Sequence, residues 1–151
     1  VAAGALQAGW PAGSAMAAGL LVGAAFGAVN GLLVSRLRLP PFIATLGTLG
    51  ITRGLTYVYL DGAPRYGFSE SFLALSQSRV AGLPASVWIM LVVFAGAHLA
   101  LTRTPFGRAI FALGGNEEAA RLSGIPVARV KVAAYTLCGA CAGLAGLLGW
   151  R

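Results

Sequence analysis

The chain has 151 residues, of which 58% are hydrophobic and only 10% charged, and its mean hydropathy is +0.81. An average soluble domain is about 25% charged, so this chain has too few polar side chains to cover a water-soluble core, which excludes a soluble enzyme and a disordered tail. The net charge of +7 comes from cations that lie between apolar stretches, so we expect them to set membrane topology and expect no nucleic-acid partner.

Four apolar stretches are long enough to cross a bilayer, whose core of roughly 30 Å needs about 20 apolar residues in a helix. These predicted crossings are residues 13–35, 42–60, 85–102 and 132–150. The sequence therefore predicts an all-α fold, a polytopic transmembrane helical bundle that forms a single transmembrane domain over residues 1–151. Because apolar sequence reaches both ends, we expect the chain to be part of a longer protein.

The connections between the crossings predict their direction. Seven cations lie in or beside the first and third connections, whereas the two cations of the second connection, residues 61–84, are offset by two carboxylates. Positively charged residues stay on the cytoplasmic side of a membrane. We therefore expect the first and third connections in the cytoplasm and the second outside.

Glycines recur every four residues in the first predicted crossing, at Gly19, Gly23, Gly27 and Gly31. Such a face of small residues lets the backbone of a neighbouring helix approach closely, so helix packing is the favoured interpretation and a pore lining is the alternative. Asn30 lies beside this face. It is a candidate for the translocation path, although a hydrogen bond between helices accounts for it equally well.

The second predicted crossing has hydroxyl groups on one helical face, from Thr45, Thr48, Thr52 and Thr56. These hydroxyls either line a path for a polyhydroxylated solute or bond to their own backbone and to neighbours. Arg53 is the one obligate charge within a crossing. It is interpreted either as an anchor whose side chain extends toward the outer surface or as a residue of the path.

The polar residues of the last two predicted crossings suggest no chemistry. His98 is typical of a group at the membrane interface, and Cys138 and Cys141 behave as small apolar residues inside a lipid-exposed helix. The single lysine, Lys131, is followed by valine and not by Ser or Thr, so there is no nucleotide-binding Gly-Lys-Ser/Thr motif. We therefore expect no enzyme, no catalytic residue, no metal site and no cofactor in this chain.

The third connection, residues 103–131, contains one predicted short helix. Its start has a turn, an N-cap residue and two carboxylates that interact favourably with the helix dipole, namely Gly114-Gly115, Asn116, Glu117 and Glu118. Its end has a cation, a C′ glycine and a proline that prevents continuation, namely Arg121, Gly124 and Pro126. The alternative interpretation is a short amphipathic connector that lies on the membrane surface, whereas a free linker would not need ends so sharply defined.

This helix resembles a known family. Glu118-Ala119-Ala120-x-x-x-Gly124 resembles the EAA-x-x-x-G coupling motif of the permease subunits of ABC importers. The wider string over residues 107–125 is similar to the ribose-type sugar permeases in particular, and so is the stretch over residues 30–48. Together the two strings run in the right order and with the right topology.

The resemblance implies a helical bundle in the bacterial inner membrane that pairs with a second copy of itself. It implies two further partners, a cytoplasmic ABC ATPase subunit, which binds the ATP, and a periplasmic sugar-binding protein. Carried over by position, the ATPase-coupling residues are Gly115, Asn116, Glu117, Glu118, Ala119, Ala120, Arg121 and Gly124. Members of this family have around ten crossings, so the chain corresponds to part of a longer permease that imports a monosaccharide, a pentose or a hexose.

Two alternatives stay open. A branched-chain amino-acid permease of the same superfamily shares the overall plan. A membrane assembly protein that transports nothing would use the glycine face for helix association and the third connection as a tether.

Overall fold

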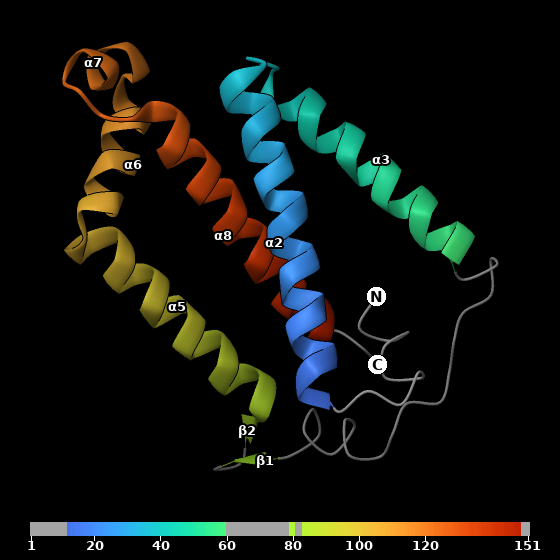
Figure 1. Ribbon diagram of the computed structural model, residues 1–151. Coiled ribbons are helices and arrows are strands. Elements are labelled where there is room, and N and C mark those ends of the chain that lie inside the picture. The colour runs from blue at the N-terminus through green and yellow to red at the C-terminus, as the bar shows by residue number, and fades with distance from the viewer. Residues whose placement is uncertain (1–11, 60–78, 81–82, 149–151) are drawn as a thin grey trace.

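The computed structural model describes residues 12–59, 79–80 and 83–148 (Figure 1). Within these ranges the chain is helical apart from one short ladder and the connections. The helices are α2 (Ala12–Arg36), α3 (Pro41–Tyr59), α5 (Ala85–Arg103), α6 (Pro105–Gly115), α7 (Glu117–Leu122) and α8 (Val127–Leu148). The last residue of the second predicted crossing, most of the second connection and the last two residues of the fourth predicted crossing lie outside the described residues.

The main packing contact is an antiparallel pair formed by α2 and α8, which lie side by side (Figure 1). Their backbones come together at glycines. A Cβ atom added at Gly23 would lie 2.5 Å from the carbonyl oxygen of Gly139, and one added at Gly31 would lie 2.7 Å from the Cα atom of Val132. Because partner positions on α8 fall as positions on α2 rise, the two helices run in opposite directions, as the predicted topology requires.

Two of the described helices, α2 over Gly13–Arg36 and α8 over Val127–Leu147, are long and apolar enough to cross a membrane. A third candidate span arises if Val87–Arg103 and Pro105–Gly115, which are bent by 76° relative to each other, are taken as one span. The helix α3 is not among the candidates, since its threonines and Arg53 reduce its apolar character. The number of four crossings therefore stays a prediction.

The bend between α5 and α6 has a local cause at Thr104. Its backbone is extended, its hydroxyl accepts a hydrogen bond from the amide of Gly107 at 3.2 Å, and Pro105 follows as the first residue of α6. Gly107 is buried against the backbone of Leu101, where a Cβ atom would meet the Leu101 Cα atom at 2.6 Å. Only a glycine permits the two helices to approach so closely at this corner.

The third connection differs from its prediction in three ways. A second helix, α6, lies over Pro105–Gly115, where no helix was predicted. The turn expected at Gly114-Gly115 is wrong, because α6 runs through both glycines and the chain changes direction one residue later, at Asn116. In addition, α8 begins at Val127 and not at residue 132. Charged residues ended the apolar stretch in the sequence, but long cationic side chains reach water from a helix end, so they do not end the helix.

The second connection contributes the only β-structure among the described residues. Strands β1 (Arg79–Val80) and β2 (Leu83–Pro84) pair antiparallel, with Arg79 opposite Pro84 and Val80 opposite Leu83. This ladder of two residues a side precedes α5, which begins at Ala85. The helical fold class is unchanged by it, although the prediction contained no strand.

The close contact of α2 with α8 yields a prediction about stability. In the full-length protein, Gly27→Ala is expected to destabilise the fold by about 1–3 kcal/mol, because the new methyl group would overlap the Tyr135 carbonyl oxygen. Thermal unfolding in detergent measures this loss. The matched control is Gly13→Ala on the same helix, where no atom lies within 4 Å and alanine favours the helix. Equal midpoints for the two variants would contradict the packing interpretation.

Candidate functional site

The start of α7 is fixed by Asn116, the residue that separates α6 from α7. Its side-chain oxygen accepts hydrogen bonds from the amides of Glu118 and Ala119, both at 3.0 Å. The backbone amide of Asn116 donates to the carbonyl of Ala112 at 3.1 Å and so completes the end of α6. One asparagine therefore ends one helix and caps the next, and both of its roles depend on extended backbone at this position.

The end of α7 has the hydrogen bonds of a Schellman motif. The amide of Gly124 donates to the carbonyl of Arg121, and the amide of Ile125 donates to the carbonyl of Ala120. Gly124 has a φ of +80°, which a side chain would strain. The short helix is therefore closed at both ends by hydrogen bonds within its own segment. Its residue Ala120 is buried.

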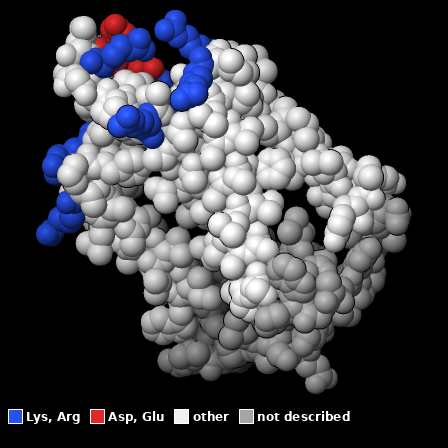
Figure 2. All heavy atoms as spheres, in the orientation of Figure 1, with Lys and Arg blue, Asp and Glu red and all other residues white. Residues whose placement is uncertain are grey.

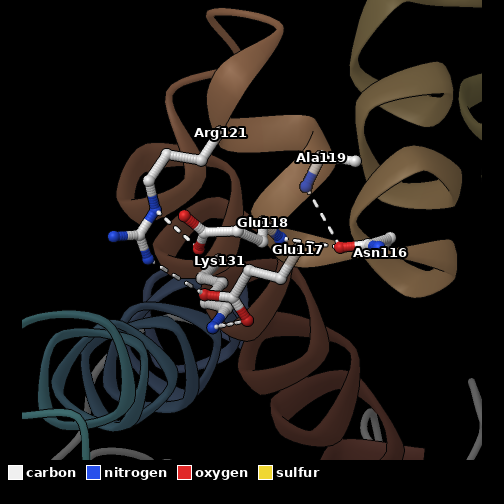
Figure 3. A network of polar contacts seen from close by, with 6 residues as sticks. All are labelled: Asn116, Glu117, Glu118, Ala119, Arg121 and Lys131. Carbon is white, nitrogen blue, oxygen red and sulfur yellow. Dashed lines mark hydrogen bonds and ion pairs between the residues drawn. The ribbon is translucent and has the colours of Figure 1, made fainter.

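Charged side chains on α7 form a small network that reaches α8 (Figure 3). The Lys131 Nζ atom donates to the Glu117 Oε2 atom at 2.7 Å, and the Arg121 guanidinium lies 3.8 Å from Glu117 and 3.9 Å from Glu118. The hydrogen bond from Lys131 holds the pKa of the Glu117 carboxyl below 4.5 against the opposing effect of burial, with further help from the charges of Lys131 and Arg121. Glu117 is therefore ionised at neutral pH.

Positive charge gathers at the end of the molecule that carries α7, as Figure 2 shows. A polar cavity of about 600 Å³ lies there, between α7, the first residues of α8 and the connection from α2 to α3. Its charged lining residues are Arg38, Glu117, Arg121 and Lys131. The two connections that were predicted to face the cytoplasm thus meet at one end of the molecule.

A second cavity, of about 680 Å³, lies between α2, α3 and α8. Its polar lining comes from Asn30 and from the hydroxyls of Thr45, Thr48, Thr52 and Thr56. The rest of the lining that α2 and α8 supply includes glycines of both helices together with Tyr135 and Cys138. Four of the five candidate path residues, Asn30, Thr45, Thr48 and Thr52, therefore face one space.

The threonine hydroxyls also bond to their own helix. Thr52 donates to the carbonyl of Thr48 at 2.7 Å, and Thr56 donates to that of Thr52 at 2.8 Å. Thr48 differs, since its Oγ1 atom lies 2.9 Å from the Asn30 Oδ1 atom as well as 3.1 Å from the carbonyl oxygen of Ala44. A hydroxyl has one proton to donate, so Thr48 can satisfy either Asn30 or its own backbone at a given moment. Thr48 is thus the polar link between α3 and α2.

Other predicted residues lie elsewhere. Arg53 is exposed on α3 and is not part of the cavity lining. Cys138 and Cys141 are free thiols, and His98 is exposed on α5. In the part of the chain that the structure describes, no group of three or more His, Cys, Asp or Glu side chains is placed to hold a metal ion.

The wall that α8 supplies was not predicted from the sequence. Gly139 and Gly143 are four residues apart and face the glycines of α2, so the fourth predicted crossing has the same small-residue spacing as the first. The pairing of Lys131 with Glu117, which are 14 residues apart, was not predicted either. No local pattern indicates that pairing, because it depends on the path of the chain between α7 and α8.

The described helices thus define an apolar membrane protein with a capped helix at its cation-rich end. Residues 1–149 match the family described as branched-chain amino acid transport system / permease component. The chain belongs to this family and is a protein of the inner membrane.

Comparison with curated relatives shows which permeases the chain resembles. The chain is 48% identical over 138 residues to the ribose import permease protein RbsC of Escherichia coli (strain K12), covering 89% of this chain and 43% of the relative. It is 44% identical to the D-allose transport system permease protein AlsC (89% and 41%) and 43% identical to the L-arabinose transport system permease protein AraH (80% and 37%), both of the same strain. The chain thus spans about two fifths of the length of these relatives. No solved structure matches it.

The cap at Asn116 yields a second prediction. Asn116→Ala removes the acceptor for two amides and is expected to destabilise α7 by about 1 kcal/mol. Hydrogen exchange at the amides of Glu118 and Ala119 measures this loss as faster exchange. Asn116→Asp keeps the acceptor and adds a favourable charge at the helix start, so it is expected to exchange as slowly as the unaltered protein. Unchanged exchange in Asn116→Ala would show that the cap does not stabilise the helix.

Proposed function

We propose that the full-length protein is the transmembrane permease subunit of an ATP-driven importer that moves a monosaccharide across the bacterial inner membrane. The observation that carries this proposal is the capped helix α7 with its EAA-x-x-x-G sequence, in a chain 43–48% identical to permeases named for ribose, allose and arabinose. The carbohydrate relatives favour a sugar over a branched-chain amino acid, although the family description names the latter.

The proposed partners follow from α7. A cytoplasmic ATPase subunit binds ATP and holds α7 in a surface groove, through residues within Gly115–Gly124. A short helix can transmit force only if its ends do not fray, and the hydrogen bonds at Asn116 and Gly124 support this role. A second permease copy and a periplasmic sugar-binding protein complete the proposed importer, and the chain itself binds no cofactor.

The proposed translocation path includes the cavity between α2, α3 and α8. Asn30, Thr45, Thr48 and Thr52 supply hydroxyl and amide groups that can exchange hydrogen bonds with a sugar. In this arrangement α3 is also a crossing, since its 19 residues extend about 28 Å at 1.5 Å per residue. Its exposed apolar side chains, among them Phe42 and Val58, then face lipid or further helices of the bundle.

The energy source tests the proposed function. Cells that lack their own importers and express the full-length protein with its neighbouring genes are expected to take up labelled ribose, allose or arabinose. Uptake should survive a protonophore and stop when ATP is depleted. Uptake of labelled leucine alone would assign the protein to the amino-acid branch. No uptake of any of the four solutes would favour the membrane assembly protein.

Removal of the Thr48 hydroxyl, which links α3 to α2, tests the proposed path. Thr48→Val keeps the shape of the side chain and removes its hydroxyl, so the maximal uptake rate is expected to fall by about two- to tenfold, the equivalent of one hydrogen bond. Thr102→Val is the matched control, because the Thr102 hydroxyl also bonds to its own helix but is not part of the cavity lining. Equal uptake by both variants would remove Thr48 from the path.

A further inference from the structure

The attachment of α7 to the membrane helices has two parts. The chain joins α7 to α6 through Asn116 and to α8 through four residues, Ser123 to Pro126. The four residues between α7 and α8 limit the distance between these two helices but do not by themselves set the angle between them. A second point of attachment between α7 and α8 constrains their relative orientation further.

The contact between Lys131 and Glu117 supplies such a second point (Figure 3). Its 2.7 Å distance is that of a strong charge-assisted hydrogen bond, and the Lys131 side chain is 24% exposed. The two ion pairs of Arg121 differ, since they are 3.8 and 3.9 Å long, lie within α7 and involve a side chain that is 52% exposed. Among the described residues, Lys131 is therefore the only cation that ties α7 to another helix by an ion pair.

The helix that receives this tie is itself fixed to a neighbour. Lys131 lies next to Val132, and the Val132 Cα atom lies where a side chain on Gly31 of α2 would be. From there to Gly143 the backbones of α8 and α2 remain in close contact. A displacement of α7 that moves Lys131 therefore moves both α8 and α2.

We propose that Glu117 and Lys131 are positioning residues that transmit the movement of α7 to the rigid pair of α2 and α8. This inference rests on the proposed function, because it requires that an ATPase moves α7. We name the Glu117–Lys131 ion pair the α7 strut. The lowered pKa of Glu117 agrees with a strut that stays charged at neutral pH.

The experiment uses the full-length permease with its ATPase and binding protein in proteoliposomes and measures sugar molecules imported per ATP hydrolysed. Lys131→Gln breaks the strut without altering α7. It is expected to leave ATPase binding and ATP hydrolysis intact and to lower the import ratio by about three- to tenfold, since one charge-assisted hydrogen bond is lost. Lys131→Arg keeps the charge and is expected to retain most of the ratio.

A matched control separates transmission from a general loss of positive charge on α8. Arg129→Gln, which removes an exposed cation two residues earlier in α8, is expected to keep the ratio of the unaltered protein and serves as the matched control.

The possible outcomes are distinguishable. An unchanged ratio in Lys131→Gln would overturn the strut, and so would loss of ATPase binding in that variant, which would indicate a role in assembly or folding. If the unaltered protein imports no sugar at all, the proposed function fails, and this is seen before any variant is measured.

Discussion

Backbone contact between α2 and α8 is possible only because no side chain stands between them at Gly23, Gly27, Gly31 and Gly139. In lipid there is no hydrophobic effect to drive two apolar helices together, so their association depends on van der Waals contact, and this contact is greatest where backbones meet directly. The consequence is a pair of helices that behaves as one body. It forms one wall of the cavity, and α3, α6 and α7 pack against it, whereas α5 packs mainly against α6.

The parts of the fold that local chemistry determines were predictable. Asn116 and Gly124 mark the ends of α7 because a side-chain acceptor and a residue with positive φ act within a few positions of themselves. The corner at Thr104 was not predicted, since it depends on the close approach of Gly107 to Leu101, and a proline after a threonine is compatible with both a loop and a helix start. The glycines of α2 indicated a packing face, but their sequence spacing could not identify α8 as the partner.

The candidate path shows why the two interpretations of the threonine face do not exclude each other. A hydroxyl that donates to its own helix retains lone pairs that can accept a hydrogen bond, so Thr52 is satisfied in the absence of a solute and still offers an acceptor to one. Such a surface costs little to expose to a cavity, and in the proposed path it would hold a sugar only weakly. Arg53, by contrast, lies outside the cavity lining, because residues one position apart on a helix point about 100° from each other.

Whether one ion pair can affect coupling depends on how its free energy compares with the coupling free energy between two sites. Coupling free energies between sites are typically 1–3 kcal/mol. A hydrogen bond to a charged group contributes about 1.5–3 kcal/mol, and this falls toward about 1 kcal/mol where water reaches the pair, as it does at Glu117, whose side chain is 43% exposed. The α7 strut is therefore of the same order as the coupling it would serve. The proposed strut has only to fix the orientation of α7, because the chain through Gly124 already limits the distance between α7 and α8.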